Sequence, residues 1–344
     1  MIWLTWRQFR IQAVVAAATL VAFAILFAAT GPHLASLYAA SGISSCHSGS
    51  CAILASSFLN QLNGTRTYAV LYNISVYAIL LTPAIIGVFW GAPLIAREFE
   101  TGTYRLAWNQ SITSTRWLAV KLALVGLAAI VVTEGLSLMQ AWWAAPIGRA
   151  VSLSGGNNLS MGRFSSLVFA THGITPVGYA AFAFTLGVTT GTLIRRAIPA
   201  MAITLVIFAA VQVTVPLWVR PNLIPPDRTI STLSSVQINA FQQNTNTFML
   251  VVGNLASEPD AWILSSKAVD AAGQPTSVTP GVCQSAGSQT AFMNCLASHG
   301  IREEITYQPV GRYWAFQWIE TAIYLVLSLA LAGFCFWRLT RRRS

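Results

Sequence analysis

Charged residues are scarce in this chain, and lysine is almost missing. Only 9% of the 344 residues are charged, and just two of the 20 basic residues are lysines. An ordinary soluble domain carries about 25% charged residues. Hydrophobic residues make up 55% of the sequence, which is more apolar surface than a soluble core can hide. The composition therefore excludes a soluble globular protein and indicates a polytopic membrane protein.

The sequence also lacks the short motifs of common soluble enzymes. Neither lysine follows the glycine pattern of a GxxxxGK[ST] loop, so the chain cannot bind ATP in that manner. The patterns GxSxG, HExxH and GxGxxG are absent as well. We therefore expect no catalytic residue, no metal site and no cofactor within this chain.

Six apolar segments are long enough to cross a bilayer, since a spanning helix needs about 20 mostly apolar residues. They lie near residues 11–30, 70–95, 117–143, 164–190, 197–218 and 314–337. The preceding stretch MIWLTWRQFR is typical of an interfacial amphipathic helix. The predicted fold is an all-α polytopic membrane protein. It divides into residues 1–218 with the first five spans, an external segment at 219–313, and residues 314–344 with the last span and a basic tail.

The positions of the basic residues favour one orientation in the membrane. If both termini are cytoplasmic, the inner segments hold 12 of the 20 arginines and lysines. A net charge of +10 could otherwise indicate a nucleic-acid partner. Because these residues flank apolar runs, we expect the lipid bilayer as the partner and no nucleic acid. The predicted location is the bacterial plasma membrane.

Four of the five cysteines lie in two polar loops. Cys46 and Cys51 share one loop, and Cys283 and Cys295 share the other. Close pairs in loops favour local disulfides, which need an oxidising face, and the predicted orientation places both loops outside. Metal binding is the rival interpretation, but no second CxxC and no cluster of histidines or acidic residues lies nearby.

The external segment 219–313 is the one candidate for a folded unit outside the membrane. It is rich in Ser, Thr, Gln, Asn and Pro. TFMLVVGNL and AWILSSKAV have the composition of short strands, and SQTAFMNCLASHG is typical of a short helix. We therefore expect a small α+β unit between the fifth and sixth spans.

Charges and aromatic residues gather between the second and third spans, in IAREFETGTYRLAWNQSITSTRW. Gly102 permits a break after the acidic residues Glu98 and Glu100. Tyr104 and Trp108 are four residues apart, so they would share one face of a short helix. The spacing fits a solvated turn with topology-setting arginines and a helix presented to a cytosolic partner about equally well.

The stretch REFETGTYRLAWNQSITSTRWLAVK resembles the loop after the second span in ABC-2 type transporter permeases. That family shows an acidic residue, Gly-Thr, a short apolar helix, a Ser/Thr-rich turn and a basic residue in this order. The resemblance implies a coupling helix within 96–116 that docks on a separate cytosolic ABC ATP-binding subunit. The residues it assigns to this contact are Glu98, Glu100, Gly102, Thr103, Tyr104, Arg105, Leu106 and Trp108.

The resemblance extends to the topology of the whole chain. The family has six spans, cytoplasmic termini, an interfacial helix before the first span, and its largest external loop between the fifth and sixth. MIWLTWRQFR and YQPVGRYWAFQWIE also resemble the actinobacterial branch. The resemblance implies an exporter of a small amphipathic solute, drug or lipid, working as a permease homodimer, with ATP and Mg bound by the partner subunit. The external segment departs from the family in its size, so relatives do not indicate the substrate.

Four polar residues lie within the predicted spans, namely Glu134, His172, Gln212 and Glu320. With a rise of about 1.5 Å per residue, all four fall at similar depth in the outer half of the bilayer. Such residues usually face an interior or a cavity. They either line a translocation path or form a structural Glu–His or Glu–Arg pair. The alternative function is a membrane-embedded enzyme that uses Glu134 and His172, or a sensor that reads through the external segment.

Overall fold

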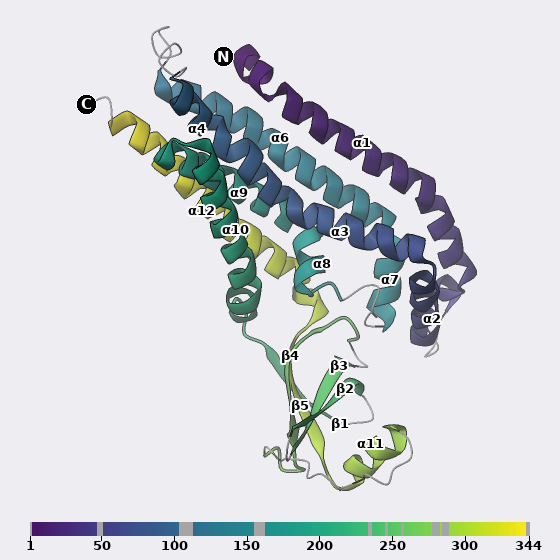
Figure 1. Ribbon diagram of the computed structural model, residues 1–344. Helices are drawn as coiled ribbons and strands as arrows, with labels where there is room; N and C mark the ends of the chain where they lie inside the picture. Colours follow the sequence, from purple (N-terminus) through teal and green to yellow (C-terminus); the bar gives the residue numbers. More distant parts are fainter. Residues whose placement is uncertain are drawn as a thin grey trace.

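The computed structural model describes residues 2–46, 51–102, 113–154, 162–232, 236–244, 247–255, 258–274, 276, 283 and 289–341. Its described part is mostly helical and contains six candidate membrane spans. These are Phe9–Ala40, Arg66–Thr101, Thr115–Trp143, Thr175–Ile194, Ala197–Asn222 and Val310–Arg341. The predicted all-α polytopic fold is confirmed. Figure 1 shows both termini at one end of the bundle, here called the terminal side, and the strands at the other, the sheet side.

The first span is longer than predicted. Helix α1 runs without interruption through Ile2–Ala40, so the residues expected as a separate interfacial helix are continuous with it. Helix α2 (Cys51–Gly64) occupies part of the predicted polar loop on the sheet side. It packs Phe58 into a core that also contains Trp143. This burial explains why residues 51–64 form a helix although they lie outside the long apolar segments.

The second span is built from three helical segments and the third from one. The second consists of α3 (Arg66–Ile86), the π-helical turn η2 (Gly87–Gly91) and α4 (Ala92–Thr101). The third is α6 (Ser114–Trp143), which continues on the sheet side into the short helix α7 (Ala145–Ser154).

The fourth span predicted from the sequence, residues 164–190, is broken near the sheet side, and only α9 (Thr175–Ile194) qualifies as the span. Helix α8 (Ser166–Thr171) ends at His172, whose backbone is extended. Gly173 then adopts φ 72°, a left-handed conformation that favours glycine, and α9 begins. Gly173 and Pro176 both lie in this stretch, and both residue types interrupt helices.

Helix α9 lies at the centre of the bundle and is largely buried. Helices α3, α4, α6, α10 and α12 pack around it. The fifth span comprises α10 (Ala197–Thr214), η3 (Val215–Val219) and η4 (Arg220–Asn222). The sixth is α12 (Tyr313–Arg341), entered through the 3-10 turn η6 (Val310–Arg312).

The region between the fifth and sixth spans forms two antiparallel sheets (Figure 1). The first has the order β1 (Asp227–Thr232), β5 (Arg302–Gln308), β4 (Trp262–Val269), and the second pairs β2 (Val236–Asn244) with β3 (Thr247–Leu255). Helix α11 (Gln289–Ser298) precedes β5. The strands predicted at TFMLVVGNL and AWILSSKAV and the short helix in SQTAFMNCLASHG are present. Strands β1, β2 and β5 were not predicted.

Candidate functional site

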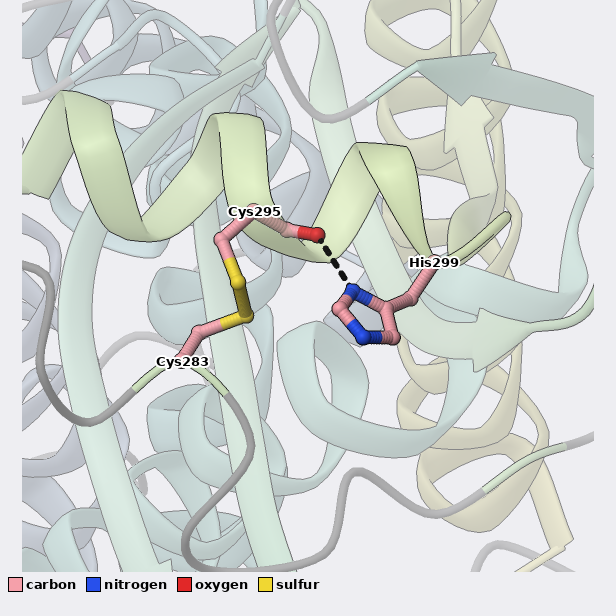
Figure 2. A group of neighbouring side chains, drawn as sticks. All are labelled: Cys283, Cys295 and His299. Carbon is pink, nitrogen blue, oxygen red and sulfur yellow. Dashed lines mark hydrogen bonds between the residues drawn. A yellow bond between two sulfur atoms is a disulfide. The ribbon is translucent and has the colours of Figure 1, made fainter.

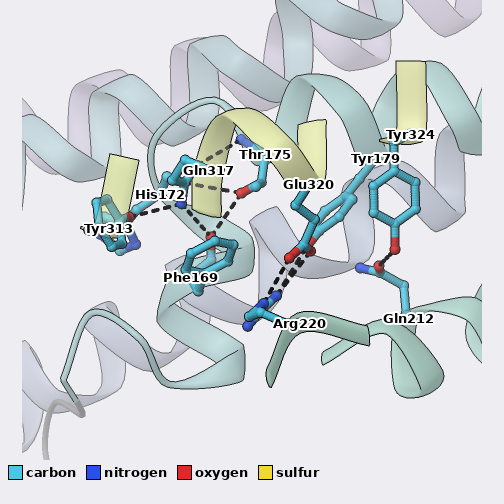
Figure 3. A network of polar contacts seen from close by, with 10 residues as sticks. All are labelled: Phe169, His172, Thr175, Tyr179, Gln212, Arg220, Tyr313, Gln317, Glu320 and Tyr324. Carbon is cyan, nitrogen blue, oxygen red and sulfur yellow. Dashed lines mark hydrogen bonds and ion pairs between the residues drawn. The ribbon is translucent and has the colours of Figure 1, made fainter. Parts of the chain in front are cut away.

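A row of polar side chains follows one face of α12 where it packs against α9. Its members are Tyr313, Gln317, Glu320 and Tyr324, at spacings of four, three and four residues, and all are buried. Residues at such spacings share one helix face. Figure 3 shows the polar contacts of this face, which form separate groups around Gln317, Glu320 and Tyr324 and are together called the α12 network.

The centre of this network is an ion pair between Arg220 and Glu320. The Arg220 Nε donates to Glu320 Oε2 at 2.8 Å, and Nη2 donates to Oε1 at 3.0 Å. The Tyr179 hydroxyl also donates to Glu320 Oε1, and the guanidinium lies 3.9 Å from the centre of the Phe169 ring. Both charged side chains are at most 1% exposed. The pair therefore joins the end of the fifth span to α9 and α12.

Gln317 forms hydrogen bonds with backbone groups at the break between α8 and α9. Its Oε1 accepts hydrogen bonds from the backbone N–H groups of Ile174 at 3.0 Å and Thr175 at 3.1 Å. Its Nε2 donates to the His172 carbonyl oxygen at 3.1 Å. A helix start leaves backbone N–H groups without intrahelical partners, and burial makes unpaired groups costly. Gln317 thus stabilises a break that the bilayer would otherwise disfavour.

The four polar residues predicted within the spans lie in different surroundings. Glu320 lies in the ion pair, and Gln212 accepts from the Tyr324 hydroxyl at 3.3 Å. His172 lies at the break between α8 and α9. Glu134 in α6 has a buried oxygen without a hydrogen bond in the described part of the chain. Three of the four therefore meet on the α12 network, and Glu134 does not join it.

A second ionic site lies on the terminal side, where α4 ends. The Glu98 carboxylate forms a buried ion pair with Lys121 of α6, and the Lys121 ammonium lies 4.8 Å from the centre of the Trp117 ring. Glu100 accepts the backbone N–H of Ala197, the first residue of α10, at 2.9 Å. A carboxylate at a helix N-terminus is electrostatically favourable. The end of α4 is therefore tied to both the third and the fifth spans.

The segment that follows α4 is framed by two helix caps. Gly102 has φ 70° and ends α4, and the Thr113 hydroxyl accepts the backbone N–H of Arg116 at 3.3 Å to begin α6. Three of the predicted docking residues, Glu98, Glu100 and Gly102, lie at the end of α4. The others lie outside the described residues: Thr103, Tyr104, Arg105, Leu106 and Trp108.

Both predicted cysteine pairs are joined as disulfides in the structure. Cys46 is bonded to Cys51, and Cys283 to Cys295, both on the sheet side. Figure 2 shows His299 beside the second disulfide, with its Nδ1 2.9 Å from the Cys295 carbonyl oxygen. These three side chains lie close enough to hold a metal ion. Thiolates are the ligand form of cysteine, so the disulfide removes two of the three ligands while it is intact.

Two cavities lie at opposite ends of the bundle. The terminal-side cavity, about 200 Å³, is lined by residues of α1 and of the second span, including Phe9, Trp90, Arg97 and Glu98. The sheet-side cavity, about 190 Å³, is lined by nine residues that include His172, Arg163 and Asp260. His172 lines the sheet-side cavity, and Glu134 lines neither of these two cavities.

Sequence reasoning missed the partners in these sites. Arg220 and Tyr179 were not predicted, and the sequence did not identify Lys121 as the partner of Glu98. A signal for the α12 face was available, because the 4–3–4 spacing of its polar residues is visible in the sequence. The partner of Glu320 lies 100 residues away, and no local pattern identifies it.

Comparison with known proteins gives one match. Residues 17–220 match the family described as ABC-2 membrane transporter related, a stretch that covers more than half of the chain. No curated protein and no solved structure matches the chain. The matched residues include most of the first span, the second to fourth spans, the fifth span up to Arg220, and the ionic site on the terminal side.

Proposed function

The chain belongs to the ABC-2 membrane transporter related family, and from that premise we propose that it exports a small amphipathic solute, drug or lipid. The family and the six spans support a membrane-spanning permease of an ABC transporter. In our proposal a separate cytosolic subunit binds ATP with Mg and hydrolyses it. Two copies of this permease form the membrane part of the transporter.

The docking site that we propose for the ATP-binding subunit is the coupling segment 96–116. The observation that supports it most is the pair of contacts made by the end of α4. The Glu98–Lys121 ion pair ties the start of the segment to α6, and Glu100 ties it to the N-terminus of α10. Because three spans meet there, a force applied to this segment would reach all three.

A double substitution tests the docking site. Tyr104→Ala/Trp108→Ala removes two aromatic side chains of the proposed contact. Truncation of an aromatic residue at the centre of an interface commonly costs roughly 2 kcal/mol or more of binding free energy. We expect the variant to lose about tenfold or more of its affinity for the ATP-binding subunit. The measurement is co-purification of the two proteins from membranes, with ATPase rate and the mass of the complex as readouts.

Trp142→Ala is the matched control for this experiment. Trp142 is an exposed aromatic residue at the sheet-side end of α6, so its loss should leave association unchanged. Equal membrane insertion of both variants must be shown first. Normal association and normal ATPase coupling in the double variant would place the docking site elsewhere. A complex mass that fits one permease copy would contradict the homodimer.

The proposed orientation places both termini in the cytoplasm and the sheet side outside the cell. Twelve of the 20 basic residues then lie in inner segments. This agrees with the excess of lysine and arginine that cytoplasmic loops carry. The two disulfides lie on the opposite side, where an oxidising compartment would preserve them. Charge distribution and cysteine chemistry support the same orientation independently.

A further inference from the structure

The sheet-side cavity has the construction of a ligand site. It lies between α3, the α6–α7 junction, α7, α8, the start of α12 and the loop before β4, and its lining is mostly apolar or aromatic. Its polar groups come from His172, Arg163, Asp260 and two tyrosines, Tyr72 and Tyr313. A mainly apolar hollow with a few convergent polar groups is the usual form of a small-molecule site.

Arg163 lines this cavity, and Asp260 holds one edge of its guanidinium. Asp260 accepts two hydrogen bonds from Arg163, one from its backbone N–H at 3.0 Å and one from Nε at 2.6 Å. The Asp260 side chain is only 3% exposed, whereas that of Arg163 is 39% exposed. Asp260 therefore fixes the arginine through Nε, and no described residue occupies the two terminal nitrogens.

This arrangement favours an anion over a cation. The carboxylate of Asp260 is already satisfied and almost covered, so it has little surface left for a cation. The free edge of a guanidinium has two N–H donors that match a carboxylate or phosphate. Arg149, next to the lining residue Gly148, is exposed and adds positive charge near the cavity.

His172 supplies an acceptor to the same cavity. Its Nδ1 lies 2.9 Å from the Val168 carbonyl oxygen, and since a carbonyl oxygen only accepts, Nδ1 carries the hydrogen. In a neutral imidazole the other nitrogen, Nε2, is then an acceptor. The cavity therefore offers donors from Arg163 and an acceptor from His172, a combination that suits an anion with an attached hydroxyl or N–H group.

We propose that the sheet-side cavity binds an amphipathic anion, with its phosphate or carboxylate on Arg163 and its apolar part along the cavity wall. The volume of about 190 Å³ exceeds that of a cavity of about 150 Å³ that admits benzene. The cavity has room for an anionic group and the first carbon atoms of an attached apolar chain. The ligand is either a lipid head group entering from the bilayer boundary or a free solute. This inference goes beyond the proposed function and does not rest on it.

Octyl phosphate is the probe that tests the site. The full chain is reconstituted in nanodiscs of phosphatidylcholine, without ATP or a partner, and titrated by calorimetry. We expect saturable binding of one octyl phosphate per chain, with much weaker binding of inorganic phosphate and of octyltrimethylammonium. Because transport is not measured, failure here would leave the permease function untouched.

Two variants identify the site. Arg163→Gln is combined with Asp260→Asn, so that no buried carboxylate is left unpaired, and affinity should fall about tenfold or more. Gly148→Leu should also weaken binding, because Gly148 lines the cavity and a Cβ there meets no atom within 4 Å, so the larger side chain fits without a clash. Gly64→Leu is the control, since Gly64 has the same open surroundings and does not line the cavity.

The outcomes separate the proposal from its rivals. Unchanged affinity in both cavity variants, or equal affinity for the cationic probe, would overturn it. Adding phosphatidylglycerol to the nanodiscs distinguishes the two sources of the anion. Competition with octyl phosphate would identify a lipid head group, and the absence of competition would identify a solute; both results support an anion site.

Discussion

The guanidinium of Arg220 is buried at the sheet side, where three spans meet. Its charge is balanced by Glu320, and the Tyr179 hydroxyl shares the same carboxylate oxygen. Removing two charges from water costs several kcal/mol each, so a buried pair contributes little net stability compared with apolar residues. Losing one partner is different, because it leaves a buried charge alone. The pair therefore acts as a constraint on how the fifth and sixth spans can separate.

Substitution of one or both partners tests this constraint. Glu320→Gln leaves the Arg220 charge without its counterion, and we expect a loss of about 3–5 kcal/mol in the free energy of unfolding. Arg220→Met/Glu320→Leu removes both charges at similar volume and should recover most of that loss. The measurement is reversible unfolding in mixed micelles. A double variant as unstable as the single one would show that the unpaired charge is not the cause.

At the scale of elements, the contact between α9 and the second span depends on facing glycines. Gly87 and Gly91 are the first and last residues of η2, and Gly187 and Gly191 lie on α9. A Cβ atom on Gly187 would lie within 3.0 Å of backbone atoms of the second span. Small residues four apart let helix backbones approach closely in a membrane, so this contact sets the distance between the two spans.

Gly187→Ala should separate these helices and destabilise the protein. Helix propensity alone predicts the opposite, because alanine is favoured over glycine by roughly 1 kcal/mol in a helix. A lower yield of folded protein and a lower thermal midpoint would therefore report the steric clash. Gly333→Ala in α12 is the control, since a Cβ there meets no atom within 4 Å. Equal stability of both variants would contradict the close approach.

Local patterns in the sequence predicted the elements better than their contacts. Apolar length identified the six spans, and short spacings identified both disulfides and α11. Helix α1 extends through Gly31 and Pro32 to Ala40, although these residues normally end a helix, because the last turns pack against other elements. The ion pairs Arg163–Asp260 and Arg220–Glu320 join residues 97 and 100 positions apart. Such contacts arise from the packing of the spans, and periodicity carries no information about them.

At the scale of the whole molecule, the strands are attached firmly to the membrane part. Trp262 at the start of β4 packs in an aromatic cluster with Phe164, Tyr313 and Phe316. The Arg163–Asp260 ion pair crosses the same boundary. Motions of the spans are therefore expected to reach the strands, and the stability of the strands bears on the sheet-side cavity.

Glu303 makes the stability of the strands depend on pH. Its side chain is buried in β5, and burial raises its pKa to about 7, with a smaller opposing effect of the Ser266 hydroxyl. Since this pKa is above the ordinary value of 4.5, the folded form holds the proton more tightly than the unfolded form. The resulting stabilisation is complete below pH 4.5 and is lost as the pH rises through about 7.

Limited proteolysis of spheroplasts would test both this pH dependence and the proposed orientation. If the sheet side faces outward, added protease should cut between the fifth and sixth spans, and faster at pH 8 than at pH 5.5. At pH 5.5 the protonated carboxyl contributes about 2 kcal/mol, because this pH is about 1.5 units below its pKa of about 7. Glu303→Gln resembles the protonated acid, so it should be cut slowly at both pH values, which also controls for the protease itself. Cleavage only after lysis would reverse the orientation, whereas an unchanged pH effect in Glu303→Gln would exclude Glu303 as its origin.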